Sequence, residues 1–278
     1  MGRLLVVRPD ARLDAELASG LNRQAHDIEF CDGELDVLEK LSARPADLII
    51  TAAATSIGDD LALLERARPL APRARVISLA STISHVELVA AMAAHVFAVF
   101  ASPLDYGEIV AMAQAALAET DWHDGIEVVS ALPQWMTLKV ACQLLTAERV
   151  IRFVTEHEST MPVHERDLLM AAFREIVVNA MEHGGGFNPA KHIEVTVART
   201  QRAVVFHFRD PGAGFDRSGL SHAAASPTPE AVMSTAIKRA ELGMRPGGFG
   251  MLIVRQIVDE VVYNERGNEV LLIKHTAP

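Results

Sequence analysis

Residues 168–186 read LLMAAFREIVVNAMEHGGG, and two periodic patterns overlap in this stretch. The apolar residues recur at spacings of three and four, which predicts a helix over 162–183 with one face packed against a core. Glu175, Asn179 and His183 recur at a spacing of four, so this helix also carries a polar stripe on a neighbouring face. Three consecutive glycines then end the helix. Taken alone, the same pattern also fits an ordinary amphipathic helix with a solvated side.

Downstream, the sequence predicts a β-hairpin that leads into a glycine-containing turn. The strands are expected over 192–199 and 202–209, and the turn DPGAGF follows at 210–215. Glycine lets the backbone approach a flat ligand closely, and a carboxylate can accept a hydrogen bond from an exocyclic amine. We therefore expect this turn to form one wall of a binding site, with Asp210 as the group that recognises the ligand.

A second glycine-rich turn, GGFG at 247–250, comes directly before another predicted helix. Such a turn offers unpaired N–H groups and the positive end of the helix dipole to phosphates. The segment 216–246 between the two turns has no clear period and is long enough for an active-site lid, from which Lys238 or Arg245 could reach a terminal phosphate. Each glycine turn is common by itself, so the prediction depends on the order of the three motifs.

In that order, the motifs of residues 135–278 resemble the ATPase domain shared by gyrase, histidine kinases and mismatch-repair ATPases. The segments EIVVNAMEHG and GGFGMLIVRQIVDEV are most similar to the anti-sigma-factor serine kinases. The resemblance implies an α/β sandwich that binds ATP and Mg²⁺.

The same resemblance implies a role for each matching residue. Glu175 would be the general base or the carboxylate that orients the attacking group, and Asn179 would be the Mg²⁺ ligand. Asp210 would accept from the adenine amine. The remaining residues would shape or contact the nucleotide: Gly212 and Gly214 at the adenine wall, Gly248 and Gly250 at the phosphates, and His183 near the phosphates, with helix capping as its alternative role.

Residues 1–120 alternate five short aliphatic runs with five helical patterns. The runs begin at residues 3, 26, 47, 75 and 95. This alternation predicts a doubly wound parallel five-stranded sheet with right-handed crossovers.

This half resembles the receiver domain of two-component response regulators. That family places an acidic pair after the first strand, a phosphoacceptor Asp after the third, Ser or Thr after the fourth, and Lys-Pro after the fifth. The resemblance implies a pseudo-receiver that takes no phosphate, with another flavodoxin-like domain as the alternative. The corresponding positions here are Arg8 and Pro9, Ala52, Ala80, and Ser102-Pro103.

Composition restricts the remaining choices. The chain has 278 residues, of which 50% are hydrophobic and 22% charged, and a formal net charge of −10, which argues against a nucleic-acid-binding surface. Its two cysteines lie far apart, which excludes zinc ribbons and disulfide frameworks. No apolar run reaches the roughly 18 residues of a membrane span, so we expect a cytoplasmic protein without membrane contact. Residues 121–134 have no helical period and are expected to be an interdomain linker.

The combined resemblances imply a signalling regulator that phosphorylates Ser or Thr of a small antagonist protein, with a sigma factor or another regulator as second partner. One alternative is an ATP-responsive binding switch without phosphotransfer. Another is an unorthodox histidine kinase that acts on a separate protein, because residues 121–162 leave no room for the phosphohistidine helix pair of a sensor kinase. Whether the chain forms a homodimer stays open.

Overall fold

The computed structural model describes residues 2–7, 11–21, 26–119, 123–214 and 250–276. The chain divides into two compact units. The first comprises Met1–Asp124 with Arg152–Glu158, and the second comprises Gly125–Ile151 with Ser159–Pro278. The expected domain boundaries at residues 120 and 135 place Arg152–Glu158 in the second domain, whereas these residues pack with the first unit.

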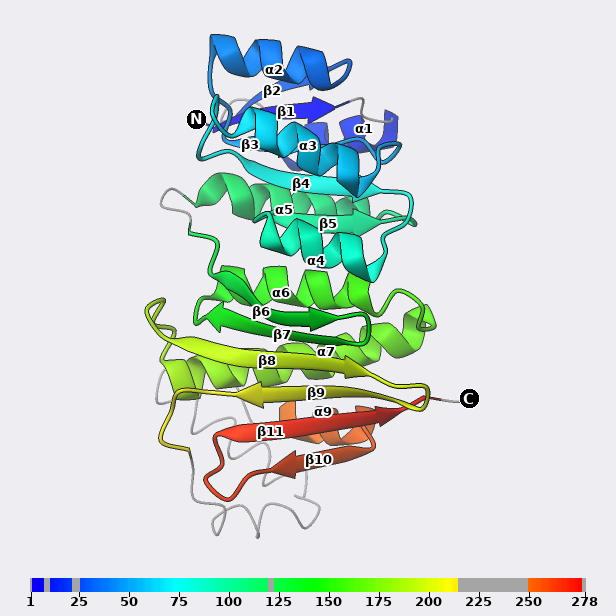
Figure 1. Ribbon diagram of the computed structural model, residues 1–278, viewed down its shortest axis with the longest axis vertical. Helices are drawn as coiled ribbons and strands as arrows, with labels where there is room; N and C mark the ends of the chain where they lie inside the picture. Colours follow the sequence, from blue (N-terminus) through cyan, green and yellow to red (C-terminus); the bar gives the residue numbers. More distant parts are fainter. Residues whose placement is uncertain (1, 8–10, 22–25, 120–122, 215–249, 277–278) are drawn as a thin grey trace. The chain divides into compact units, whose positions relative to one another are not determined.

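The first unit is a parallel five-stranded sheet with the order β2-β1-β3-β4-β5. This is the flavodoxin-like strand order, and it confirms the predicted doubly wound fold. Helices α1 and α5 lie on one face, and α2, α3 and α4 lie on the other (Figure 1). The elements are β1 (Gly2–Val7), α1 (Ala11–Gly20), β2 (His26–Cys31), α2 (Glu34–Ala43), β3 (Leu48–Ile50), α3 (Ile57–Ala67), β4 (Arg75–Ala80), α4 (His85–Ala93), β5 (Ala98–Ala101) and α5 (Tyr106–Ala118).

Short sequence signals begin two of these helices. Ser56 Oγ accepts a hydrogen bond from Asp59 N before α3, and the Asp59 carboxylate accepts one from Ser56 N in return. Ser84 and Glu87 form the same capping box before α4. Each box satisfies backbone donors that a helix N-terminus otherwise leaves open.

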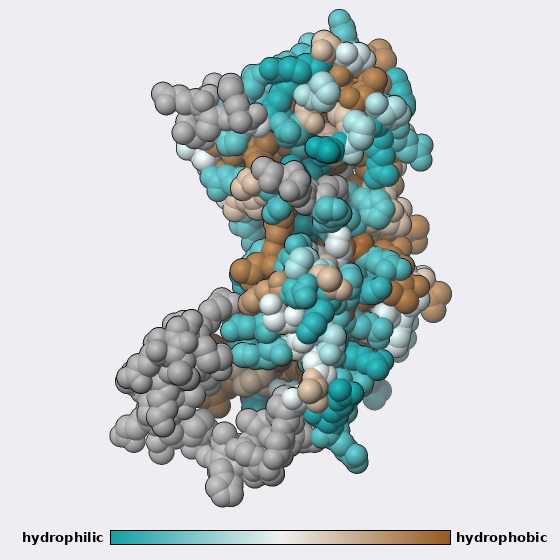
Figure 2. All heavy atoms as spheres, turned by 90° about the vertical axis from the view of Figure 1, so that its left-hand side faces the viewer, coloured by the Kyte–Doolittle hydropathy of each residue, from teal (hydrophilic) through white to brown (hydrophobic). Residues whose placement is uncertain are grey.

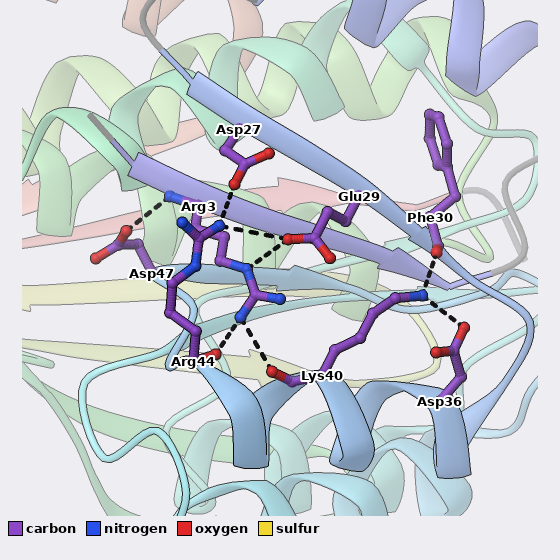
Figure 3. Close-up of polar contacts among 8 residues, drawn as sticks. All are labelled: Arg3, Asp27, Glu29, Phe30, Asp36, Lys40, Arg44 and Asp47. Atoms are coloured by element: carbon purple, nitrogen blue, oxygen red, sulfur yellow. Dashed lines mark hydrogen bonds and ion pairs between the residues drawn. The ribbon is translucent and has the colours of Figure 1, made fainter.

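A charged network ties β1, β2 and α2 together at the amino ends of the strands (Figure 3). Arg3 is buried, and its Nε donates to Glu29 Oε1 over 2.7 Å, while its backbone N donates to Asp47 Oδ2 over 2.7 Å. Its Nη1 donates to the carbonyls of Lys40 and Arg44 at the C-terminus of α2. Arg3 therefore caps a helix and pairs with a carboxylate, which is a structural role. Ligand sites of open α/β sheets lie at the opposite, carboxyl ends of the strands.

The second unit is a six-stranded antiparallel sheet with the order β10-β11-β9-β8-β7-β6. Helices α7 and α9 lie behind it in Figure 1, so the predicted two-layer α/β sandwich is confirmed. Its elements are β6 (Ile126–Leu132), β7 (Trp135–Ala141), α7 (Val163–Asn179), the π-helix η1 (Ala180–Gly185), β8 (His192–Arg199), β9 (Ala203–Arg209), α9 (Gly250–Ile257), β10 (Glu260–Tyr263) and β11 (Glu269–His275). Helix α6 (Leu144–His157) begins in the second unit, and its residues from Arg152 onward belong to the first.

An aromatic cluster fixes α7 on this sheet. The Phe173 ring lies 5.0 Å from that of Phe206 and 5.1 Å from that of Phe208, centroid to centroid. All three side chains are buried, and such edge-on or tilted pairs add to the stabilisation from burial alone. The apolar face predicted for the helix is thus the face that holds the polar stripe in place.

The expected linker at 121–134 is wrong for Ile126–Leu132, which form strand β6. This strand pairs with β7 only and has a register shift at Val129, so it is an edge strand with a bulge. Most of its side chains are exposed or half-exposed. An edge strand with an irregular register carries no clean alternation of apolar and polar residues, which is why its sequence looks like a loop.

The surface mixes polar and apolar residues. Hydrophilic residues cover most of the face drawn in Figure 2, with apolar residues among them. None of the helices that the structure describes is long and apolar enough to cross a membrane.

Candidate functional site

The carboxylate and the amide of the predicted polar stripe are in contact. Glu175 and Asn179 lie one turn apart on α7, both half-buried, and Asn179 Nδ2 donates to Glu175 Oε1 over 3.1 Å. The bond orients the amide, so that its Oδ1 remains an acceptor for another group. Glu175 and Asn179 therefore present oxygen atoms from the same turn of helix.

His183 does not continue this stripe. The α-helix ends at Asn179, and residues 180–185 form a π-helix that ends at Gly186 with φ +65°. A π-helix bonds residues five apart, which changes the phase of the side chains, and such turns are frequent at functional sites. The expected α-helix to residue 183 is thus wrong in its last turn, because the glycines permit this wider turn. His183 is exposed and acts electrostatically on Asp210.

The π-turn brings Gly184 against the residue that follows β9. Asp210 Oδ1 accepts from Gly212 N over 2.7 Å. A Cβ on Gly184 would lie 2.2 Å from Asp210 Oδ1, and a Cβ on Gly212 would lie 2.9 Å from the Gly184 Cα. These contacts leave no room for side chains, so glycine is required at both positions. The turn predicted to form a wall and the end of the polar helix therefore meet at Asp210.

The surroundings of Asp210 act on its pKa in opposite directions. Burial raises the pKa above its ordinary value, while the Gly212 N–H and the charges of Arg266 and His183 lower it, with a net upward shift. The carboxylate is half-buried, and among the residues that the structure describes only Gly212 donates a hydrogen bond to it. One oxygen thus stays available to accept from a ligand.

A second contact brings the start of α9 to Glu175. Helix α9 begins at Gly250, and a Cβ there would lie 1.8 Å from Glu175 Oε1. The expected phosphate-binding helix N-terminus thus lies next to the candidate catalytic carboxylate. Gly248, the segment 216–246 and its cations Lys238 and Arg245 lie outside the described residues.

Sequence reasoning missed the turn between β10 and β11. Arg266 donates from Nε to Ala213 O over 3.1 Å and from Nη2 to Gly212 O over 3.3 Å. Asn268 Nδ2 donates to Asp210 O over 3.3 Å. These pairs are separated by more than fifty residues, so no local spacing could indicate them.

In the first unit, alanine stands at the positions expected for the phosphoacceptor after the third strand and for the Ser or Thr after the fourth. Ala52 follows β3 and is 5% exposed, and Ala80 ends β4 and is 1% exposed. Ser102-Pro103 follows β5. Arg8, Pro9 and Asp10 lie outside the described residues.

Comparison with known families bears on the second unit. Residues 140–274 match the model of the histidine kinase-like ATPase domain. The match covers just under half of the chain and includes Glu175, Asn179, Asp210 and Gly250. The ATPase-like domain thus contains every candidate site residue. No curated protein matches the chain.

Solved structures resemble the receiver-like unit. A signal receiver domain from Pseudomonas fluorescens is 22% identical over 42% of this chain and 94% of its own, with a TM-score of 0.36. A response regulator from Hahella chejuensis is 22% identical over 44% of this chain and 100% of its own, with a TM-score of 0.38. A CheY-like receiver domain from Methanospirillum hungatei is 19% identical over 42% of this chain and 94% of its own, with a TM-score of 0.37.

The residues of the ATPase-like domain fit Mg²⁺ and a nucleotide. Magnesium prefers oxygen ligands and is usually held by one or two side chains together with substrate phosphates. Asn179 Oδ1 supplies such an atom, whereas no group of three His, Cys, Asp or Glu among the described residues could hold a metal alone. Gly184 and Gly212 pack closely against Asp210, whose carboxylate accepts from Gly212 N with one oxygen and leaves the other for the amine of a base.

Proposed function

We propose that this chain is a signalling regulator that binds Mg-ATP in its second unit and transfers the terminal phosphate to Ser or Thr of a small antagonist protein. The observation that carries the proposal is the meeting of Glu175, Asn179 and the N-terminus of α9 at Gly250. A carboxylate, an Mg²⁺ ligand and a helix dipole at one place are the parts that phosphoryl transfer uses, since it depends on positioning and charge neutralisation.

In this proposal each residue has a separate task. Glu175 takes a proton from the attacking hydroxyl or orients it, and Asn179 holds Mg²⁺, which neutralises charge on the phosphates when bound. Asp210 accepts from the adenine amine, with Gly212 and Gly214 forming that wall. Gly250 and Gly248 admit the phosphates to the start of α9, and His183 contributes positive charge from the η1 side.

The first unit would then serve as a docking surface that is not phosphorylated. Buried methyl groups at Ala52 and Ala80 support this role, because neither can accept a phosphoryl group. The same observation favours a second candidate, an ATP-responsive switch in which both units bind partners and no phosphate moves. The second partner in either case is a sigma factor or another regulator, in an anti-sigma type of circuit.

Label transfer from γ-labelled Mg-ATP tests the proposal. The protein is incubated with its native lysate, and labelled proteins are separated and treated with acid or base. A label that survives acid and is lost in base is a phosphoester on Ser or Thr, which the proposal expects. An acid-labile label would indicate a histidine kinase. Nucleotide binding without any transferred label would indicate the switch.

A further inference from the structure

The turn between β10 and β11 is organised around one side chain. Asn264 Oδ1 accepts from the backbone N–H groups of Gly267, Asn268 and Glu269 over 2.7, 3.1 and 3.2 Å. Asn264 Nδ2 donates to Asn268 Oδ1 over 2.9 Å. A side chain that satisfies several turn amides at once holds the turn in one conformation.

This turn is joined to Asp210 on both sides of the backbone. Asp210 N donates to Asn268 O over 3.0 Å, and Asn268 Nδ2 donates back to Asp210 O over 3.3 Å. Asn268 is 7% exposed, so these bonds are protected from water. The main chain of Asp210 is therefore fixed by a segment 58 residues further along the sequence.

Arg266 extends the connection to Gly212 and Ala213, which follow Asp210 in the same turn. Its guanidinium donates to the carbonyls of Gly212 and Ala213, the two that follow Pro211. Gly214 has φ +81°, and a Cβ there would lie 1.9 Å from Arg266 O, so the two backbones are pressed together. Arg266 thus holds the backbone of residues 212–214, which would form the wall next to the base.

Two further titratable side chains, His183 and Cys142, interact electrostatically with Asp210. His183 acts from η1, and Cys142 acts from the end of β7. Burial raises the pKa of Cys142, so this thiol is neutral near pH 7, and Lys191 acts on Cys142. Among the described residues, Arg266 and His183 are the side chains whose positive charge lowers the pKa of Asp210, with Arg266 the stronger of the two.

We propose that Arg266 is a positioning residue of the nucleotide site: it fixes residues 210–214 against η1 and places a positive charge beside Asp210, the acceptor for the base. The inference rests on the proposed nucleotide site and adds the element that sets its pH range. The charge and the hydrogen-bonding geometry of Arg266 can be separated, because lysine keeps the charge but not the geometry and glutamine loses the charge.

The test compares the full-length protein with Arg266→Gln, Arg266→Lys and the control Arg202→Gln, whose arginine is exposed on the β8–β9 hairpin. The Asp210 carboxyl is titrated by ¹³C NMR without nucleotide, and affinity for an Mg-bound, non-hydrolysable ATP analogue is measured between pH 5 and 8. Thermal unfolding of each variant shows whether it is folded.

In Arg266→Gln the Asp210 titration midpoint should rise by about half a pH unit or more, the scale of one partly solvated charge. Nucleotide affinity should fall about threefold to tenfold at pH 6 and less at pH 8, because the variant loses ionised Asp210 first at low pH. Arg266→Lys should restore the midpoint but not the full affinity, since an ammonium lacks the planar fork that reaches two carbonyls.

The outcomes separate this inference from the proposed function. An Asp210 midpoint that stays the same in Arg266→Gln, or shifts equally in Arg202→Gln, overturns the role of Arg266, whatever the nucleotide results are. A wild-type protein that binds no nucleotide at any pH contradicts the proposed function, while the NMR titration still decides what Arg266 does to Asp210. If Arg266→Gln does not fold, the midpoint in Arg266→Lys decides: a retained midpoint supports the charge, and a raised one contradicts it.

Discussion

At the scale of single residues, burial raises the pKa of one aspartate in each unit, Asp60 in the first and Asp210 in the second. Asp210 lies where a ligand could donate a hydrogen bond to it, whereas Asp60 is buried in the first unit. The Asp60 carboxylate accepts from Thr51 Oγ1 over 2.6 Å and from Thr55 Oγ1 over 2.8 Å. We therefore expect substitution of Asp210 to change nucleotide binding and substitution of Asp60 to change the pH dependence of stability.

Asp210→Asn should abolish most of the thermal stabilisation that Mg-ATP gives to the second unit. At a ligand concentration about 100 times Kd, binding stabilises by about 2.7 kcal/mol, which raises the melting temperature by several degrees. The amide replaces an accepting oxygen with a donor, so the adenine amine loses its partner. Scanning calorimetry with and without Mg-ATP measures the shift, with Asp167→Asn, an exposed position on α7, as the control. A full-sized shift in Asp210→Asn would show that Asp210 does not recognise the base.

Asp60 should make the first unit less stable as pH rises. Burial raises its pKa from 3.8 to about 6, so the folded state binds the proton more tightly than the unfolded state. The resulting stabilisation is complete below pH 3.8 and is lost as the pH rises through about 6, and it amounts to at most about 3 kcal/mol.

Hydrogen exchange of the β3 and β4 amides in the full-length protein, from pH 4 to 7, measures this effect through the opening free energy. Asp60→Asn should flatten the decline. Asp59→Asn is the matched control with the opposite sign, because hydrogen bonds from Ser56 lower the pKa of Asp59, whose contribution is lost as the pH falls. An equal pH dependence in the wild type and Asp60→Asn would contradict the assignment.

At the scale of secondary-structure elements, the sequence predicts the regular parts well and the irregular parts poorly. Helix and strand periods place β8, β9 and the start of α7 within a residue or two, because their apolar faces are buried. The strand β6 was missed because an exposed, bulged edge carries no clear period. The π-turn was missed because its wider spacing depends on glycines whose conformation is set by contacts with Asp210.

In the candidate site, too, some contacts follow from a local sequence pattern and others do not. Glu175 and Asn179 follow from a local spacing on one helix, and the structure confirms that they lie one turn apart and in contact. The contacts of Arg266 and Asn268 with the Asp210 turn depend on the register between β9 and β11, which pairs Arg209 with Glu269. A single sequence contains no information about such a long-range register until the strand order is known.

Gly184→Ala should weaken nucleotide binding while the fold is kept. A methyl group there would lie 2.2 Å from Asp210 Oδ1, so the carboxylate or the π-turn must move. We expect a loss of about tenfold or more in affinity, in line with the displacement of a single positioned group. The control is Gly186→Asn, since Asn tolerates the positive φ and no atom lies within 4 Å of the added Cβ. Titration calorimetry distinguishes them, and equal affinities of the two variants would mean that the Gly184 contact is irrelevant to binding.

At the scale of the whole molecule, two units with different chemistry are joined in one chain. The first has the flavodoxin-like strand order with Ala52 and Ala80 at the ends of β3 and β4, and residues 140–274 match the model of a histidine kinase-like ATPase domain. In the proposed function, covalent phosphorylation is a reaction that the second unit performs on another protein, and the first unit takes no phosphate.

Treatment of the full-length protein with acetyl phosphate and Mg²⁺ should leave the first unit unmodified, because Ala52 provides no carboxylate at the end of β3. Intact-mass measurement followed by peptide mapping checks this. An aspartyl adduct of about 80 Da, for instance on Asp47 or Asp10, would contradict the pseudo-receiver interpretation. A conventional receiver domain treated in parallel confirms that the reagent is active.

The central claim is that Glu175 acts in phosphoryl transfer and not in nucleotide binding. The most direct measurement pairs the affinity for Mg-ATP with the rate of label transfer to the partner, in the wild type, Glu175→Ala and Glu175→Gln, the last of which keeps an acceptor for Asn179. We predict affinities within about threefold of the wild type and transfer slower by about 10²-fold or more in both variants, the usual scale for a positioned base. Loss of ATP binding in Glu175→Gln, or unchanged transfer in either variant, would contradict the account.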